Sequence, residues 1–468
     1  MTSGDEAVLR AYQKTFSKLV ARSWLDPTLR ERLKTDPAQA LAALGVADLS
    51  DAEALAVAKF IQDDGGQPRP SGGAHDPASG GPPPDAEPAF AMKKPRLASH
   101  VVVRAAPPDP SGTEALHFVS SRRQLKLEGH RLRLFHDVVL PLLDGRRTMD
   151  DIEAASRPQF RPEELRKSLG LLASHNLLQD AARDTLDEPA RTRLAPQLNF
   201  FHELGADAQA VQARLAQATV AVFGLGGAGT AACLALAGAQ VGNLRCIDAA
   251  RVLPSDPVMA PAFSADSVGR PRAQVVAAMV KAAAPDVNVT ACTDALETED
   301  AVLGAIEGSD FVVCCIDPGL ASLVYKVNRA CLRAGIGWTA CSASAFEGVV
   351  GPTIVPFSTA CWLCYQMREA ACADRPEDAL AHLEFLDARR TDDSGVRENN
   401  PFGAGAVGNL AALEAFKKLS GVVDPVSVGH IVVLDFLRLT TARHLVLRKP
   451  DCPACSRAPK AAGAPVRP

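Results

Sequence analysis

The sequence predicts an α/β protein whose largest part is a doubly wound parallel sheet, preceded by a small α+β unit and a helical N-terminal segment. Apolar runs alternate with helical patterns from Leu215 onward, which is typical of a parallel sheet with helices on both faces. A glycine-rich turn, Gly224–Gly229, directly follows the first of these runs. A tract rich in glycine and proline separates the N-terminal segment from the remainder of the chain.

Composition and charge describe an ordinary globular protein. The chain has 468 residues, of which 47% are hydrophobic and 22% charged, and its formal net charge is −4. At about 150 residues per domain this length predicts roughly three units, and the charge gives no sign of a nucleic-acid or anionic-membrane partner. We expect no secretory signal, and no apolar run reaches the roughly 18 residues of a membrane span. The expected location is the cytoplasm.

Residues 1–62 are expected to form short helices. Ala7–Val20 places apolar side chains at helical spacing on one face, and two later Asp-Pro steps suit helix starts, because aspartate favours the N-cap and proline the first helical position. Residues 63–93 should be a disordered tether, since 13 of the 24 residues in Gly65–Pro88 are glycine or proline. A disordered tail is expected at 457–468.

Residues 94–185 predict a winged-helix-like domain of three strands and three helices. The expected strands are Val101–Arg104, Leu116–Val119 and Leu125–Glu128, and the expected helices are Arg131–Leu143, Thr148–Ser156 and Arg161–Asn176. Thr148 and Pro162 suit helix starts. Such a unit often binds DNA, but the third helix mixes charges and carries no basic stripe, so we expect no nucleic-acid partner.

The glycine-rich turn predicts a phosphate-binding site at Gly224, Gly226 and Gly229. An apolar strand, Thr219–Phe223, ends just before it and an apolar helix follows. Glycines let the backbone approach an anion, and the helix N-terminus supplies oriented N–H donors. Asp248, at the end of the next expected strand, is placed to bond a ribose hydroxyl. Together these features indicate nucleotide-binding ancestry without showing that the activity is retained.

Two C-x-x-C pairs predict a structural zinc site. The chain has 12 cysteines, and four of them form the pairs: Cys361, Cys364, Cys452 and Cys455. Four thiolates at paired spacing suit a closed tetrahedral Zn²⁺ site, which leaves no ligand position for a substrate. The alternatives are four unrelated buried cysteines, or redox pairs, which fit less well because neither pair opens a helix after a thioredoxin-like strand.

Residues 215–456 resemble the ThiF/MoeB family of ubiquitin-activating-type adenylating enzymes. The resemblance rests on the paired cysteines and on Gly224–Gly229, Asp248, Val268–Ala273, Ser309–Asp317 and Phe346–Gly348, which follow that family's order and spacing. It implies a Rossmann-like domain over 186–456. In active members, a basic residue at the position of Arg272 and an Mg²⁺-binding aspartate at that of Asp317 serve the ATP site.

Three positions depart from that family's pattern. The arginine that neutralises triphosphate charge in active members is Met259 here, and a thioether cannot replace a guanidinium. The family's next glutamine is Ala260, and the asparagine after the Mg²⁺-binding aspartate is Pro318. We therefore expect a degenerate nucleotide site that does not use ATP and Mg²⁺, and we assign no catalytic residue.

The domain at 94–185 resembles the leader-recognition domains of peptide natural-product pathways. Lys94–Leu97, Leu142–Arg147 and the strand and helix order carry the resemblance. Its fusion to a ThiF-like domain bearing Val350–Pro356 and the first cysteine pair is similar to the "ocin-ThiF-like" partners of azole-forming clusters. That resemblance implies that the protein binds the leader of a ribosomally made precursor peptide. It then presents the core to a YcaO cyclodehydratase, which uses ATP to form azolines.

Residues 15–46 resemble the nitrile-hydratase-type leader of such precursors, although the cysteine-rich metal motif of nitrile hydratase itself is absent. The chain thus combines a leader-like segment, a tether and a receptor, so residues 1–60 are a candidate ligand of their own chain or of a second copy. A homodimer is expected, because the ThiF-like family usually pairs through its sheet domain. The sequence leaves open whether the fusion is natural or engineered, and which core peptide and product are involved.

An edge strand at Gln124–Glu128 and the helix Pro162–Asn176 are expected to bind the leader. An edge strand offers unpaired backbone groups to which an extended peptide can add. Selectivity is expected from side chains in the groove between strand and helix, namely Leu125, Leu127, Leu165, Leu169 and Leu172. The alternative for each leucine is a place in the core of the domain.

Three functions from different classes therefore compete. The first is a non-catalytic, ThiF-like partner subunit of a cyclodehydratase. The second is an active ATP-dependent adenylyltransferase acting on a peptide or carrier-protein C-terminus, and a winged-helix regulator is a third. Residue 259 separates the first two, and exchange of pyrophosphate into ATP is the assay that decides between them.

Overall fold

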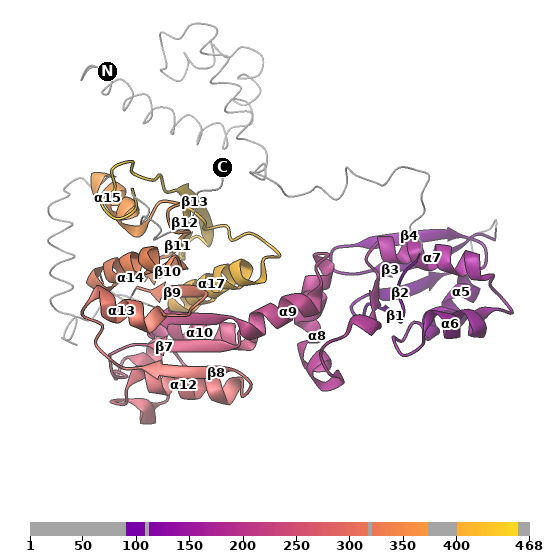
Figure 1. The fold of residues 1–468 in the computed structure, drawn as a ribbon, viewed down its shortest axis with the longest axis horizontal. Helices are drawn as coiled ribbons and strands as arrows, with labels where there is room; N and C mark the ends of the chain where they lie inside the picture. Colours follow the sequence, from indigo (N-terminus) through magenta and orange to yellow (C-terminus); the bar gives the residue numbers. More distant parts are fainter. Residues whose placement is uncertain (1–89, 108–111, 317–320, 373–399, 457–468) are drawn as a thin grey trace, which may run out of the picture. The chain divides into compact units, whose positions relative to one another are not determined.

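The computed structural model describes residues 90–107, 112–316, 321–372 and 400–456. All of them belong to the compact unit Ala89–Pro468 (Figure 1). The predicted helical segment at 1–62, nearly all of the tether at 63–93 and the tail at 457–468 lie outside the described residues, as do Asp317 and Pro318.

The first part of this unit is a small α+β domain. Its three-stranded antiparallel sheet has the order β2-β3-β4, and a two-stranded β1-β5 ladder lies beside three helices. The strands are β1 (Pro95–Leu97), β2 (Val102–Ala106), β3 (Glu114–Val119), β4 (Gln124–Gly129) and β5 (Leu178–Asp180). The helices are α5 (Leu132–Val138), α6 (Met149–Ser156) and α7 (Pro162–Ser174). Among the described strands, β4 is an edge strand, as predicted.

Local sequence explains how these helices begin and end. Helix α6 opens with a capping box, in which the hydroxyl of Thr148 accepts from the Asp151 N–H and the Asp151 carboxylate accepts from the Thr148 N–H. Pro162 opens α7 at a position where a missing N–H costs nothing. The first predicted helix ends earlier than expected, at Val138, because Pro141 belongs to a separate 3₁₀ turn.

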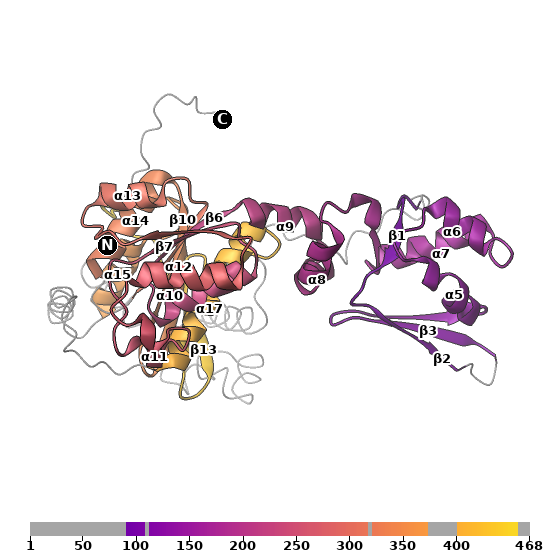
Figure 2. The same cartoon turned by 90° about the horizontal axis from the view of Figure 1, so that it is seen from below.

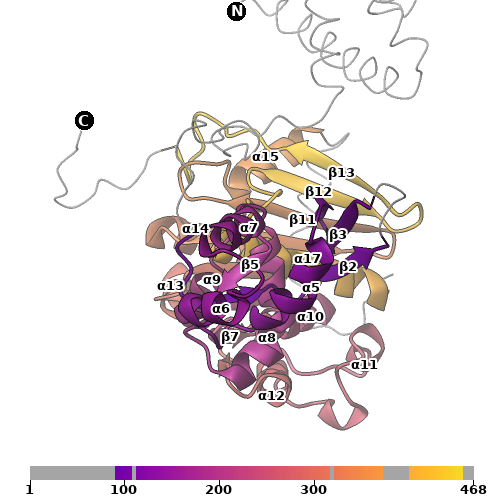
Figure 3. The same ribbon diagram turned by 90° about the vertical axis from the view of Figure 1, so that its right-hand side faces the viewer.

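The remainder is an α/β domain around an eight-stranded sheet of order β13-β12-β11-β10-β9-β6-β7-β8. Its strands are β6 (Thr219–Phe223), β7 (Asn243–Ile247), β8 (Asn288–Cys292), β9 (Phe311–Cys315), β10 (Gly337–Ala343), β11 (Glu347–Ile354), β12 (His430–Asp435) and β13 (Thr440–Leu445). Strands β8, β7, β6, β9 and β10 pair in parallel, whereas β10 to β13 pair antiparallel, with β13 at the outer edge (Figure 3). The sheet is therefore mixed, which corrects the prediction of a fully parallel one.

Helices cover both faces of this sheet (Figure 2). One face carries α10 (Gly227–Gly238), α12 (Arg272–Ala283) and α17 (Pro401–Ser420), and the other carries α13 (Glu299–Ile306) and α14 (Ala321–Ala334). Side chains of β6 alternate between them: Val220 and Val222 pack with the first group, Ala221 and Phe223 with the second. A strand buried on both faces has a continuous apolar sequence, which is why it was predictable.

Helices α10 and α17 pack closely enough to require glycine. A Cβ at Gly408 would lie 2.1 Å from the carbonyl oxygen of Ala228. The remaining helices are α8 (Glu188–Glu203), α9 (Ala208–Gln217), α11 (Asp256–Met259) and α15 (Trp362–Cys372). None of the helices in the described ranges combines the length and apolar character that a membrane crossing requires.

Candidate functional site

The predicted glycine turn lies at the carboxyl end of β6. Gly224 has a φ of +74°, in the left-handed region that favours glycine. Gly226 is the N-cap of α10 and, being glycine, has no side chain that could cap the first N–H groups of the helix. A Cβ at Gly229 would lie only 1.9 Å from the carbonyl oxygen of Gly224. The glycines thus allow the tight turn that brings the amino end of α10 to the edge of the sheet.

Asp248 follows β7 and holds this turn in place. One of its carboxylate oxygens accepts a hydrogen bond from the Leu225 N–H at 2.8 Å, and the other accepts from the Ala250 N–H at 2.7 Å. The oxygen bonded to Leu225 also lies 3.2 Å from Nη1 of Arg272. The structure therefore brings the glycine turn, Asp248 and Arg272 together, whereas Asp317 lies outside the described residues.

Arg272 begins α12, and only 7% of it is exposed. Its Nε and Nη2 atoms donate to one carboxylate oxygen of Asp256 at 3.1 and 2.9 Å, in addition to the contact with Asp248. Two carboxylates of the protein therefore balance the charge of this guanidinium, as a buried charge requires. Sequence reasoning missed Asp256, whose signal is an Asp-Pro step three residues before Met259.

Met259 ends α11 beside the first turn of α10. A Cβ at Gly227 would lie 3.0 Å from the carbonyl oxygen of Met259 and 2.9 Å from Cβ of Ala404. The backbone of α11 and the first turn of α17 are thus packed against the amino end of α10. What faces this end from residue 259 is a carbonyl oxygen, an electronegative group.

The four predicted zinc ligands form one cluster. Their Sγ atoms all lie within 4.8 Å of one another, and all four side chains are buried. The Sγ–Sγ distance is 3.9 Å for Cys361–Cys364, 3.7 Å for Cys361–Cys452 and 3.6 Å for Cys364–Cys455. A tetrahedral ion with Zn–S bonds of about 2.3 Å places its sulfurs roughly 3.8 Å apart. The donor set and its spacing therefore fit a metal ion such as zinc.

Burial and backbone dipoles act on these thiols in opposite directions. Burial raises the pKa of the Cys361 thiol. At Cys452 burial also disfavours the thiolate, but backbone N–H groups, including that of Ala454, outweigh it and lower the pKa. The Lys449 N–H lies 3.4 Å from Sγ of Cys364. Neighbouring thiolates repel one another, so a cation is needed to hold all four in the ionised form that binds metal.

The five leucines predicted to line a peptide groove do not share one environment. Leu165, Leu169 and Leu172 on α7 are 1%, 0% and 0% exposed and belong to the core of the small domain. They present no surface to a ligand, because α7 turns this apolar stripe inward. Leu125 and Leu127 on β4 are half-buried and pack against the same core.

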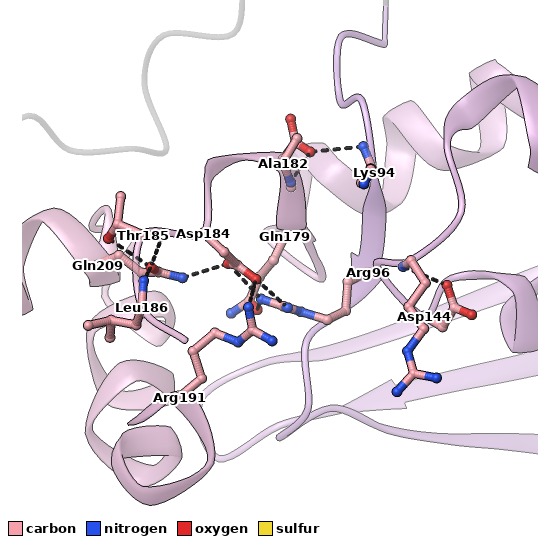
Figure 4. Close-up of polar contacts among 12 residues, drawn as sticks. Lys94, Arg96, Asp144, Gln179, Ala182, Asp184, Thr185, Leu186, Arg191 and Gln209 are labelled. Atoms are coloured by element: carbon pink, nitrogen blue, oxygen red, sulfur yellow. Dashed lines mark hydrogen bonds and ion pairs between the residues drawn. The ribbon is translucent and has the colours of Figure 1, made fainter. Parts of the chain in front are cut away.

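A polar cluster fixes the connection between the small domain and α8 (Figure 4). The carboxylate of Asp184 accepts from Arg96 on β1 at 2.8 Å and from Arg191 on α8 at 2.5 Å. Gln209 on α9 donates to the same carboxylate at 2.5 Å, and its Oε1 accepts from the Thr185 N–H at 2.6 Å. This one carboxylate, which is 10% exposed, thus joins three elements. The sequence analysis had named only the stretch Lys94–Leu97, which contains Arg96, and had given it no such role.

A second buried group at this connection contains two histidines. Nε2 of His202 lies 2.9 Å from the carbonyl oxygen of Asn176, and burial lowers the pKa of His202. Nε2 of His100 lies 3.0 Å from a carboxylate oxygen of Glu203. Arg123 donates to the backbone carbonyl of Glu203 at 3.0 Å. Polar contacts therefore link the small domain to the carboxyl end of α8.

The fold and site define an α/β protein with a nucleotide-type glycine turn after the first strand of its domain, an acidic residue after the second and a four-cysteine cluster. The pattern of the ThiF family matches residues 194–454. That span is more than half of the chain, and the chain belongs to the ThiF family.

Individual relatives agree with this assignment. The sulfur carrier protein ThiS adenylyltransferase of Escherichia coli (strain K12) is 31% identical over 245 residues, which cover 52% of this chain and 88% of that protein. The microcin C7 biosynthetic enzyme MccB, solved in complex with N-formylated MccA, has a TM-score of 0.56 at 18% identity and covers 77% of this chain and 99% of its own. PaaA has a TM-score of 0.57 at 18% identity and covers 75% and 99%. At these identities, the two solved structures show a shared fold that extends beyond residues 194–454.

Proposed function

We propose that this protein binds the leader of a ribosomally made precursor peptide and presents its core to a YcaO cyclodehydratase for azoline formation, without ATP chemistry of its own. The observation that carries the peptide-binding part of the proposal is the fold shared with MccB over 77% of the chain, because MccB was solved in complex with N-formylated MccA. The YcaO partner is proposed from the family resemblance. The length of this match supports a common role for the small domain and the ThiF domain together.

The leader is proposed to add to β4. This strand ends the three-stranded sheet, so one row of its backbone N–H and C=O groups has no partner strand among the described residues. Leu125 and Leu127 are half-buried beside this edge, and Lys126 between them is exposed. These residues replace the buried α7 leucines as proposed contacts.

The proposed absence of ATP chemistry is supported by the environment of Arg272. A triphosphate needs cations, yet this guanidinium is already paired with Asp248 and Asp256, and Met259 supplies no second one. We propose that the cysteine cluster holds Zn²⁺ in a structural role, since all four ligand positions come from the protein. A homodimer through the sheet domain is proposed from the family resemblance.

Fluorescence anisotropy tests the binding proposal. A labelled peptide covering residues 15–46 is titrated with the chain that begins at residue 89. The variant Leu127→Arg should bind at least about tenfold more weakly, because a charged side chain replaces an apolar contact of the docked strand. The matched control is Val102→Arg, since Val102 is exposed on the opposite edge strand β2. Equal binding by the parent and by folded Leu127→Arg contradicts the proposed site.

An active adenylyltransferase is the second candidate, because the ThiS adenylyltransferase is 31% identical and the glycine turn and Asp248 are in place. Pyrophosphate exchange separates the two functions. If the purified protein exchanges pyrophosphate into ATP when given a candidate peptide, ATP chemistry is present and the non-catalytic proposal is wrong. If exchange stays at the buffer level while peptide binding is observed, the binding function is supported.

A further inference from the structure

We propose that Asp256 is a specificity-determining residue of the glycine-turn site, and that its pairing with Arg272 makes the site select against polyphosphate ligands. The inference deepens the proposed function, on which it rests, by naming the group that excludes ATP. Asp256 is 8% exposed, and its carboxylate is directed at the guanidinium of Arg272.

The hydrogen bonds leave Asp256 firmly in this position. The oxygen that accepts from Nε and Nη2 of Arg272 also accepts from the Leu253 N–H at 2.9 Å. Arg272 is fixed from its own side as well, because its backbone N–H bonds the carbonyl oxygen of Ala250 at 2.9 Å. Nη1 points to Asp248, which is bound in turn to the glycine turn through Leu225. A new anion at this guanidinium competes with two carboxylates that already neutralise it.

The charges around the turn therefore oppose a triphosphate. Asp248 and Asp256 each carry a negative charge, and the carbonyl oxygen of Met259 faces the first turn of α10 at Gly227. Arg272 is the guanidinium bonded to both of them. These two carboxylates and one guanidinium together carry a net negative charge, and like charges in a buried place repel strongly. A ligand without phosphate charge, such as adenosine, is not subject to this electrostatic repulsion.

The test is a binding measurement on the full-length chain and the variant Asp256→Asn. The amide keeps the size and an acceptor oxygen, but it removes the charge. A fluorescent ATP analogue with Mg²⁺ should bind Asp256→Asn about tenfold or more tightly than the parent, since a like charge has been removed from its site. Adenosine, measured by calorimetry, should bind both proteins equally. The matched control is Asp266→Asn, which removes the same charge from an exposed residue nearby and should change nothing.

Two results would overturn the inference: no gain for ATP in a folded Asp256→Asn protein, or an equal gain for adenosine, which would mean that pocket shape rather than charge is responsible. Asp256→Ser is a second uncharged variant, for which the same gain is expected if the asparagine protein does not fold. Asp256→Glu keeps the charge and should keep the weak ATP binding. Leader binding at β4 does not involve Asp256, so the two proposals can fail separately.

Discussion

Replacing Leu169 by alanine should destabilise the small domain. Under the proposed function, it should weaken peptide binding only as a consequence of that destabilisation. Leu169 is fully buried among the apolar residues of this domain. The carbon atoms lost are worth about 2.4 kcal/mol of transfer free energy at about 0.8 kcal/mol per buried methylene. The cavity left behind adds to this, so we expect a total loss of about 3–4 kcal/mol, within the usual range for buried Leu→Ala changes.

Hydrogen exchange followed by mass spectrometry measures this loss where it occurs. Amides of β3 and α7 should exchange about 100- to 1,000-fold faster in Leu169→Ala, because each 1.4 kcal/mol or so corresponds to a factor of ten. Fluorescence of Trp338 and Trp362, both in the α/β domain, should stay unchanged. The matched control is Leu171→Ala on the same helix, where the side chain is 43% exposed and the expected effect is within about 0.5 kcal/mol.

The result that would refute this reasoning is a Leu169→Ala protein whose α7 amides exchange at the parent rate while its leader binding is weakened. Leu169 would then contact the ligand rather than the core. Loss of protection together with loss of binding, by contrast, is what core destabilisation produces.

Three further predictions concern the other clusters. Cys452→Ser should lower both the bound zinc, measured by elemental analysis, and the free energy of unfolding, because a three-thiolate site binds metal less tightly. Cys372→Ser changes an exposed cysteine outside the cluster and should alter neither. Asp184→Asn should destabilise the connection at α8 by about 1–3 kcal/mol, since it weakens a carboxylate shared by two arginines; an unchanged melting temperature would contradict this. Burial holds the pKa of His202 in the folded protein below its unfolded value of 6.5. As the pH falls, the unfolded chain therefore takes up this proton before the folded protein does. The free energy of unfolding should be at its full value above about pH 6.5 and decrease below it. Thermal melts from pH 7.5 to 5.5 should show a smaller decline for His202→Gln than for the parent, and no difference for His444→Gln on the exposed strand β13.

Much of the fold was predictable because its signals are local. Strands such as β6 are buried on both faces and read as continuous apolar runs, and Thr148 and Pro162 mark helix starts within a few residues. The β1-β5 ladder was missed because Pro95 pairs with Asp180, far along the chain, and three-residue strands carry no pattern of their own. The antiparallel strands β12 and β13 were missed because they are partly or fully exposed and their sequences are mixed.

The candidate site likewise has parts that local sequence predicts and parts that depend on contacts between distant residues. The cysteine cluster was predictable, because C-x-x-C spacing is itself a property of metal ligands, and the four Sγ atoms do meet. The burial of the α7 leucines was not predictable. Helical spacing shows that Leu165 and Leu169 share a face, but it does not show whether that face packs into a core or lines a groove. Asp256 was not predicted as a site residue, because its partner Arg272 lies sixteen residues further along the chain and only the folded loop brings the two together.

The pairing of Asp256 with Arg272 also offers a structural reason for the fold to keep its glycine turn under the proposed function. A buried guanidinium costs several kcal/mol unless a counter-charge accompanies it, and a site that relies on phosphate for this purpose is strained whenever it is empty. Here the counter-charges are Asp248 and Asp256, and they are present at all times. Under the proposed function, Arg272 then has a structural role, because it bonds Asp248, whose carboxylate also accepts from the Leu225 N–H of the turn.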